Sequence, residues 1–240
     1  MRFKLSIVLA VLASCVVQTK PEQSNQYLDS VHSICLVRTT TATGSEEFGT
    51  CFAYKSQEVK TLEETLYKTY FLTNHHVVED RDETKSNVIY TSDPFWLSVP
   101  DFLQEERSIP YAVEFSDEFS DVAVISVVTR DQIPTLALDN NIPSFGQEIF
   151  CIGYPLGSGV LLTKGHVGHY IAADRKWIAS CQITFGNSGG PVMDQKTGKV
   201  IGITKGMAAI NSVPLIHLWH LQNFIPCSDV CNMLVIKDLL

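Results

Sequence analysis

The chain has 240 residues, of which 45% are hydrophobic and 18% charged, so it has room for one large domain or two small ones and enough apolar side chains to fill a core. This composition excludes a disordered or fibrous chain. The 18 lysines and arginines against 26 aspartates and glutamates give a net charge of −8, which leaves no basic field for a phosphate backbone and excludes nucleic acid as an expected partner.

The N-terminus is laid out as a secretory signal. Two basic residues lie within the first four, an apolar run follows over residues 5–13, and the small residues Ala13 and Ser14 precede Cys15. This apolar run is well short of the roughly 20 residues that a helix needs to cross a bilayer. Residues 1–14 are therefore predicted to be a signal peptide that directs export.

The segment after the apolar run has two interpretations. Residues 12–15 (LASC) resemble the lipobox of bacterial lipoproteins, in which the cysteine thiol is diacylated and becomes the new N-terminus. Cys15 would then be the lipidation site and attach the protein to a membrane, whereas the alternative is an ordinary signal peptide that contains a cysteine. Residues 15–30 are mostly polar, as expected for a tether. The protein is predicted to be a periplasmic or cell-envelope lipoprotein, or otherwise secreted.

From Ser30 to Gly206 the chain shows short β-prone runs separated by turn-rich segments. Few stretches have a helical period, and strands do not alternate with helices. This pattern favours antiparallel β-barrels or a sandwich over a parallel sheet. We expect strands over residues 31–37, 50–54, 70–73, 88–91, 112–115, 122–128, 148–152, 160–163, 176–183 and 199–204.

Three further segments complete the predicted organisation. Residues 55–68, rich in Glu, Lys and Leu, indicate either a short surface helix or a long hairpin. Residues 129–146 contain prolines and asparagines and are predicted to cross between two β units of similar size. Ser228 is a good N-cap, and the apolar run that follows it predicts a helix over residues 228–240.

Six cysteines remain if Cys15 carries lipid. An even number in an oxidising compartment is compatible with disulfides, whose connectivity the sequence leaves open. The alternative is that several of them are buried free thiols that behave as small hydrophobic residues. The six are Cys35, Cys51, Cys151, Cys181, Cys227 and Cys231.

No metal, nucleotide or other cofactor is predicted, because no CxxC, HExxH or P-loop sequence is present. Two histidine pairs, His166 with His169 and His217 with His220, have a spacing of three. In strands this spacing points the two side chains to opposite faces, and no cysteine or carboxylate completes a ligand set. These histidines are predicted to be structural.

Residues 185–192 (FGNSGGPV) place Ser188 among glycines. A nucleophilic serine needs a tight loop that exposes its hydroxyl while neighbouring N–H groups converge on one point, and glycines let the backbone fold that closely. The alternative for this stretch alone is a flexible surface turn.

Two other segments offer the groups that such a serine requires. Residues 70–78 (YFLTNHHVV) end an apolar run with His75 and His76, and imidazole is the side chain best suited to take a proton from a serine hydroxyl near neutral pH. Residues 120–127 (SDVAVISV) open a strand with Asp121, a carboxylate that can hold the tautomer of a histidine. Considered separately, each segment also fits an ordinary turn.

The order His, Asp, Ser in an all-β chain resembles that of the chymotrypsin-like (trypsin-like) serine peptidases, and at the motif level the chain is most similar to bacterial proteases of the HtrA (Deg) type. The motifs that carry the resemblance are TNHHVV, SDVAVISV, FCIGYPLGSG, GNSGGPV followed by GKVIGI, and NFIPCSDV. The resemblance implies a protease domain over residues 31–240, without the PDZ domain that the family often appends. It implies two six-stranded antiparallel β-barrels, at about 31–130 and about 141–225, and the helix at 228–240.

The family also implies the roles of individual residues. His76 would be the general base, because in the family the catalytic histidine directly precedes the residue pair that is Val-Val here. Asp121 would orient His76, with Asp117 as a weaker rival. Ser188 would attack the scissile carbonyl, and the N–H groups of Gly186 and Ser188 would bind the oxyanion.

The resemblance carries over to the substrate pocket and to activation as well. Asn187 stands where the digestive branch has an aspartate that pairs with the ammonium freed by zymogen cleavage, so activation by trimming is not expected. Lys205 stands where the HtrA pattern has a small polar residue. Its side chain is expected to point to water, although acidic residues would be preferred if it faced the pocket. The walls of the pocket are expected to be Gln182 and Ile183 on one side and Thr204, Lys205 and Gly206 on the other.

The predicted function is an exported serine endopeptidase that hydrolyses peptide bonds of a polypeptide through a Ser-His-Asp triad and an acyl-enzyme. The alternative is a catalytically silent protein with the protease fold that binds peptides, and the presence of all three triad residues argues against it. The GxSxG pattern at residues 186–190 also fits an α/β-hydrolase esterase. That fold requires the order Ser, acid, His and alternating helices, and the chain shows neither.

Overall fold

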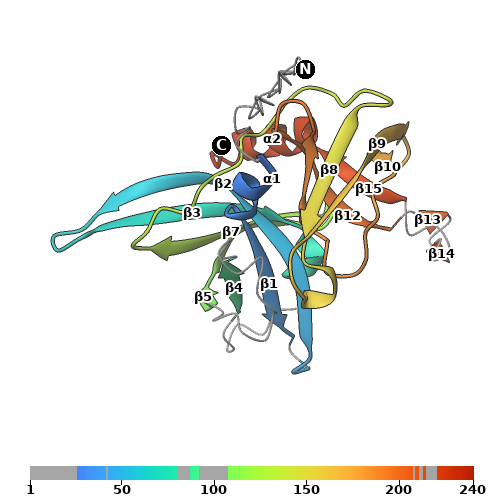
Figure 1. Cartoon of the computed structure of the whole chain (residues 1–240). Coiled ribbons are helices and arrows are strands. Elements are labelled where there is room, and N and C mark those ends of the chain that lie inside the picture. Colours follow the sequence, from blue (N-terminus) through green and yellow to red (C-terminus); the bar gives the residue numbers. More distant parts are fainter. Residues whose placement is uncertain are drawn as a thin grey trace, which may run out of the picture.

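The computed structural model describes residues 26–41, 43–79, 87–91, 108–207, 209–210, 213–214 and 221–240. The predicted signal peptide, Cys15 and most of the expected tether lie outside these residues. Strands dominate and form two β units that lie side by side, with the helix α2 packed next to them (Figure 1). Within the described part of the chain, no helix is both long and apolar enough to cross a membrane.

The first unit is a seven-stranded antiparallel sheet in the order β5-β4-β1-β2-β3-β7-β6. Its edge strands β5 and β6 are consecutive in the chain, with only Tyr111 between them. One bent segment therefore pairs with β4 at one edge and with β7 at the other, and this replaces the closed six-stranded barrel that was expected. The strands are β1 (Ile34–Thr40), β2 (Glu46–Lys60), β3 (Thr65–Thr73), β4 (Val88–Thr91), β5 (Ser108–Pro110), β6 (Ala112–Asp117) and β7 (Val122–Thr129).

The second unit is a closed barrel in the order β10-β15-β12-β11-β8-β9, as predicted. Residues 130–147 connect the two units, so the expected crossover is confirmed. The all-β, chymotrypsin-like fold class is also confirmed, because the described chain combines this barrel with the first sheet. The barrel strands are β8 (Glu148–Gly153), β9 (Leu161–Ile171), β10 (Lys176–Ala179), β11 (Pro191–Asp194), β12 (Val200–Met207) and β15 (Gln222–Pro226), and β13 (Ala209–Ile210) pairs separately with β14 (Val213–Pro214).

Residues 55–68 form the long hairpin that was one of the two predicted alternatives. Strands β2 and β3 pair from Phe52 opposite Leu72 out to Lys60 opposite Thr65. The outer half of β2 is exposed, and the hairpin extends well away from the rest of the molecule (Figure 1). Its inner half lies in the core and carries residues of the site described below.

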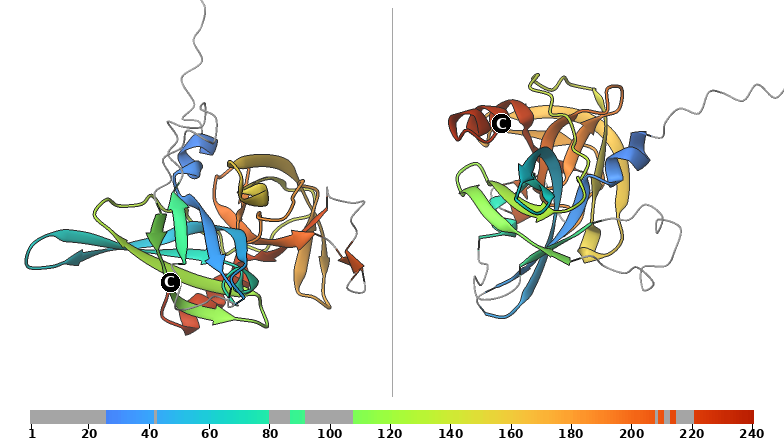
Figure 2. Two further views of the ribbon diagram at one scale, coloured as in Figure 1. Left: turned by 90° about the horizontal axis from the view of Figure 1, so that it is seen from below. Right: turned by 90° about the vertical axis from the view of Figure 1, so that its left-hand side faces the viewer.

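The C-terminal helix differs from the prediction at both ends. Helix α2 (Cys227–Ile236) has Pro226 as its N-cap and receives no side-chain capping bond, so Ser228 is not the cap. The strand β15 ends at Pro226 and the helix follows at once, which leaves no room for a separate capping residue. After the helix, the Tyr54 hydroxyl donates to the carbonyl of Leu239 at 3.0 Å and ties the chain end to the first sheet. Figure 2 shows the C-terminus beside this sheet.

The largest apolar cluster runs between the two units. Phe52 from the first sheet, Phe150 from the barrel and Leu234 from α2 are fully buried members of it. The short helix α1 (Gln26–Val31) adds Tyr27, whose ring meets Phe150 edge to face at a centroid distance of 4.8 Å. Because the units share a core, residues from both can be held together in one site.

The six cysteines of the described chain are all buried and free, in line with the free-thiol alternative. Cys35 and Cys51 are directly opposite each other in the pairing of β1 with β2. Burial raises the pKa of the Cys51 thiol, and burial also raises that of Cys151, which lies next to Cys181. The Cys51 and Cys151 thiols are therefore protonated at neutral pH, and all six cysteines are shielded from solvent.

We expect iodoacetamide at pH 8 to label these six cysteines only slowly in the folded protein and completely after unfolding, because alkylation requires an accessible thiolate. Mass spectrometry of the tryptic peptides reads each cysteine separately and keeps Cys15 apart from the rest. A cysteine that resists alkylation in the unfolded chain until a reductant is added is in a disulfide, and this result would contradict the prediction.

Candidate active site

His76 and Asp121 are brought together by the pairing of two strands. His76 lies in the 3₁₀ turn η1 (His75–Val77) after β3, and Asp121 directly precedes β7, which pairs with β3 so that Thr73 faces Ala123. The ring Nδ1 of His76 lies 2.9 Å from Asp121 Oδ1 and 3.1 Å from Oδ2. The backbone N–H of His76 also donates to Oδ1 at 3.1 Å. One carboxylate thus fixes both the backbone and the ring of His76.

Asp121 is held in a special backbone conformation. Its φ of +58° is in the left-handed region, which Asp tolerates better than most residues, and Asn74 Nδ2 donates to its carbonyl at 2.9 Å. Burial raises the pKa of the Asp121 carboxyl, but the hydrogen bonds and charge of His76, together with the charge of Lys205, outweigh burial, so the pKa lies below its usual value. The carboxylate is therefore ionised at neutral pH.

The rival residues have other partners. His75 Nε2 lies 3.0 Å from Glu79 Oε2, and its Nδ1 lies 2.7 Å from Ser116 Oγ. Asp117 accepts hydrogen bonds from the N–H and the hydroxyl of Ser120. The geometry therefore pairs His76, rather than His75, with Asp121.

The loop that carries Ser188 packs so tightly that two of its positions accept only glycine. Gly186 has φ +93°, and a Cβ there would lie 2.2 Å from the carbonyl oxygen of Tyr154. Gly189 has φ +86°, and a Cβ there would lie 2.1 Å from the carbonyl oxygen of Thr50. The loop is a rigid close contact between the two β units rather than the flexible turn that was the alternative.

The backbone N–H groups of this loop fall into two sets. Those of Asn187, Gly189 and Gly190 donate to backbone carbonyls. Those of Gly186 and Ser188 have no acceptor among the residues that the structure describes. These are the two donors that the family resemblance implied for an oxyanion, and both are available to a ligand.

Thr50 on β2 holds the loop from the other unit, a role that no motif in the sequence predicted. Its N–H donates to the carbonyl of Ser188 at 2.8 Å. Its hydroxyl donates to the carbonyl of Gly186 at 2.7 Å and accepts from the N–H of Tyr154 at 3.0 Å. Its carbonyl accepts from the hydroxyl of Thr73 at 2.8 Å. The only sequence signal was a polar residue at the start of an otherwise apolar strand.

Lys205 connects Ser188 to the His76–Asp121 pair. The Ser188 hydroxyl donates to the carbonyl of Lys205 at 3.3 Å, and the Lys205 ammonium lies 3.1 Å from Asp121 Oδ2. The expectation that Lys205 points to water is wrong, since its side chain is only 26% exposed and forms this ion pair. Within the described chain, no direct hydrogen bond joins Ser188 to His76.

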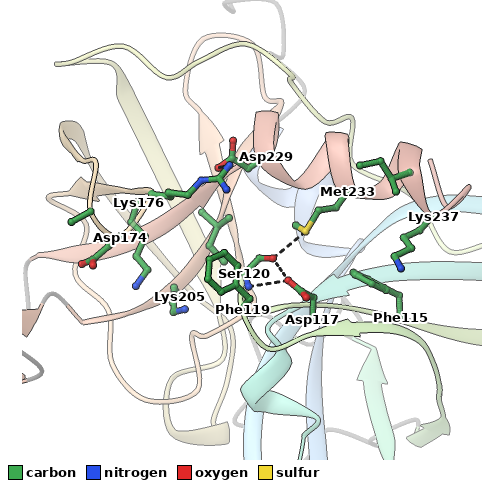
Figure 3. A pocket seen from close by; sticks show the side chains of 14 residues that line it. Phe115, Asp117, Phe119, Ser120, Asp174, Lys176, Lys205, Asp229, Met233 and Lys237 are labelled. Carbon is green, nitrogen blue, oxygen red and sulfur yellow. Dashed lines mark hydrogen bonds and ion pairs between the residues drawn. The ribbon is translucent and has the colours of Figure 1, made fainter.

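The two expected walls of the substrate pocket belong to different cavities. One of about 340 Å³ contains Gln182 and Ile183, together with Leu161, Thr184 and Asn187. The other, of about 560 Å³, contains Lys205 (Figure 3). Thr204 is buried and its hydroxyl donates to Gln222 at 3.4 Å, while Gly206 lines neither of these cavities.

The described residues contain no group of three His, Cys, Asp or Glu side chains placed to hold a metal. His166 and His169 are both exposed on β9. His217 and His220 lie outside the described residues.

Comparison with known proteins identifies relatives of this arrangement. A family model described as the trypsin-like peptidase domain matches residues 49–203. The serine endoprotease DegS of Escherichia coli K12 is 25% identical over 142 residues, which are 56% of this chain and 36% of DegS. A probable periplasmic serine endoprotease, DegP-like, of Halomonas elongata is 33% identical over 144 residues, which are 56% of this chain and 26% of that protein. The chain therefore spans about a third or less of the length of these relatives.

Solved structures show the same fold. The serine endoprotease from Yersinia pestis superposes with a TM-score of 0.65 at 18% identity, over 92% of this chain and 68% of that one. The active form of the Rv3671c protease from M. tuberculosis superposes with a TM-score of 0.67 at 19% identity, over 88% of this chain and 83% of that one.

The clamp on the Ser188 loop is testable through Thr50→Val, which keeps the side-chain shape but removes the hydroxyl. We expect the free energy of unfolding to fall by about 1–3 kcal/mol, because a buried carbonyl and a buried N–H lose their partner. Urea denaturation measures the change. Thr65→Val, at an exposed position of β3, is the matched control and should stay within about 0.5 kcal/mol of the wild type. Equal stability of Thr50→Val and the wild type would show that the hydroxyl clamps nothing.

Proposed function

The chain belongs to the trypsin-like peptidase family, and from this premise we propose that it is a serine endopeptidase that cleaves peptide bonds in a polypeptide substrate. The observation that carries the proposal is the His76–Asp121 pair beside a serine loop with two unoccupied N–H groups. His76, Asp121 and Ser188 are the proposed triad. The names of the relatives, serine endoproteases, support the same reaction.

The proposed proton transfers follow from the tautomer of His76. Its Nδ1 is engaged by Asp121, so Nε2 is the nitrogen that accepts the proton from Ser188 Oγ as Oγ bonds to the scissile carbonyl carbon. The hydroxyl reaches Nε2 by rotation of the Ser188 side chain away from the Lys205 carbonyl, since catalytic hydrogen bonds commonly tighten only with substrate bound. His76 then gives the proton to the leaving amine, and water releases the acyl group by the reverse sequence.

The N–H groups of Gly186 and Ser188 are the proposed oxyanion hole. Negative charge develops on the carbonyl oxygen during attack, and donors already held in place stabilise it without reorganisation. Losing one such donor typically lowers turnover by about 10² to 10³. The Thr50 clamp on the carbonyls of Gly186 and Ser188 supports this role, because it fixes the peptide groups that directly follow the two donor residues.

The loop has no need of a zymogen step in this proposal. Asn187 is buried and uncharged, and its N–H donates to the carbonyl of Thr184 at 3.2 Å. Contacts within the chain therefore hold the loop in place. In the digestive branch of the family, an aspartate at this position pairs instead with the ammonium freed by zymogen cleavage. The cavity lined by Gln182 and Ile183 is the proposed pocket for the substrate side chain before the cleaved bond.

Export is the second part of the proposal. Residues 1–14 are the proposed signal peptide, residues 15–30 the tether and residues 31–240 the protease domain, with Cys15 as the proposed lipid attachment point. The described end of the tether is helical, because α1 begins at Gln26. The relative from Halomonas elongata carries the word periplasmic in its name, which supports an exported location.

A fluorophosphonate probe tests the triad without knowledge of the substrate. We expect labelling of the wild type, no labelling of Ser188→Ala, and a loss of more than about 100-fold in rate for His76→Ala, because the serine loses its base. His75→Ala is the control and should label at a rate close to that of the wild type. A folded wild type that does not react would favour the silent peptide-binding alternative, and labelling of Ser188→Ala would refute Ser188 as nucleophile.

Mass spectrometry of the mature N-terminus tests the export proposal. We expect the protein purified from a bacterial envelope to begin at Cys15 with a diacylglyceryl mass, and Cys15→Ser to remain unprocessed or to be released without lipid. A mature protein that begins elsewhere and carries no lipid supports the ordinary signal peptide. A chain that retains Met1 in the cytoplasm would refute export.

A further inference from the structure

Lys205 occupies an irregular position in the barrel that turns its two polar groups in different directions. In the pairing of β12 with β15, Thr204 faces Phe224 and Gly206 faces Asn223, so Lys205 is an extra residue, a β-bulge. A bulge re-aims a side chain that regular pairing would point elsewhere. Here the carbonyl of Lys205 accepts from the Ser188 hydroxyl, and the ammonium reaches Asp121.

We propose that Lys205 is a positioning residue of the active site, whose ammonium fixes the Asp121 carboxylate and keeps the His76 ring in its neutral, basic form at lower pH. This inference rests on the proposed function. Asp121 Oδ1 is occupied by the backbone N–H and the ring of His76, whereas Oδ2 is shared between the ring and the Lys205 ammonium. The ammonium therefore contacts Oδ2, the carboxylate oxygen that has one contact with His76, whereas Oδ1 has two.

The charge of Lys205 acts on the histidine as well. The Lys205 Nζ and the His76 Nδ1 each lie 3.1 Å from the same carboxylate oxygen, so they are within about 6 Å of each other. The Asp121 side chain is 7% exposed, and charges in such a place are screened less than at the surface. An imidazolium that forms beside Asp121 meets a carboxylate already paired with one cation. Protonation of the ring in the free enzyme is therefore less favourable than with Asp121 alone.

A second lysine lies near the first, on the neighbouring wall of the cavity (Figure 3). Burial lowers the pKa of the Lys176 ammonium, and the positive charge of Lys205 lowers it further. Lys176 forms no ion pair within the described chain, so Lys205 is the cation that contacts Asp121. The other charged groups around this site are Asp174, the Arg175–Asp229 pair, Asp117 with its Ser120 partner, Lys237 over the Phe115 ring, and the His75–Glu79 pair.

The pH dependence of fluorophosphonate labelling separates this role from a purely structural one. The rate constant for labelling is measured from pH 4 to 9 at constant ionic strength for the wild type and four variants. Lys205→Met removes the charge and the donor, Lys205→Gln removes the charge and keeps an N–H donor on a side chain one atom shorter, and Lys205→Arg keeps both charge and donor. Lys237→Met is the matched control, because it removes a lysine that lines the same cavity but does not contact Asp121.

We expect the acid limb of the profile to move to higher pH by about 0.5 to 1 unit in Lys205→Met and in Lys205→Gln, because the imidazolium gains stability when the neighbouring cation is removed. Lys205→Arg and Lys237→Met should keep the acid limb of the wild type. The plateau rate should fall several-fold in Lys205→Met and less in Lys205→Gln, which retains an N–H donor for Oδ2. Circular dichroism of each variant identifies any that fails to fold, and Lys205→Gln then carries the test.

A profile in which both neutral variants lose rate equally at every pH would overturn the inference and leave Lys205 a structural residue. An acid limb that moves to lower pH would overturn it as well. Neither result bears on the proposed triad, which is tested separately by the labelling of the wild type, Ser188→Ala and His76→Ala.

Discussion

The arrangement of the site depends on one buried, ionised carboxylate. Asp121 binds the backbone and the ring of His76, and it can do so only because β3 and β7 pair in a register that brings the end of one strand beside the start of the other. A buried carboxylate without partners would be protonated or would destabilise the fold. Hydrogen-bond donors from His76 and Lys205 offset that cost. The same contacts that make the buried carboxylate stable therefore also orient the His76 ring.

The serine loop belongs to the barrel and requires the first β unit to be in place. Its glycines come so close to Thr50 and Tyr154 that the loop has no conformation of its own apart from these contacts. The apolar cluster shared by the two units sets the distance between them. At this distance, Thr50 of the first unit forms hydrogen bonds with the carbonyls of Ser188 and Gly186 in the barrel. A change in the packing between the units therefore acts directly on the two N–H groups proposed to stabilise the oxyanion.

The sequence indicated the fold class and the residues of the proposed triad because these signals are local. A serine among glycines, a histidine after a strand and an aspartate before one are each visible in a short window. The Thr50 hydrogen bonds and the Lys205–Asp121 ion pair were not visible, since the first depend on contacts between the units and the second on a bulge set by pairing with β15. The expected helix cap at Ser228 failed for a related reason, because β15 continues to Pro226 and the helix starts immediately. At Thr50, Lys205 and Ser228, contacts with elements distant in the sequence determine what the residue does, and a short sequence window does not contain them.

A cation next to the aspartate of a triad has two opposed effects on the rate. It weakens the pull of Asp121 on the imidazolium, which lowers the strength of His76 as a base once the ring is free of its proton. It also increases the fraction of molecules whose ring is free at acidic pH. The first effect offsets part of the plateau rate that the ammonium provides by fixing the Asp121 carboxylate, and the second effect extends the proposed activity to lower pH.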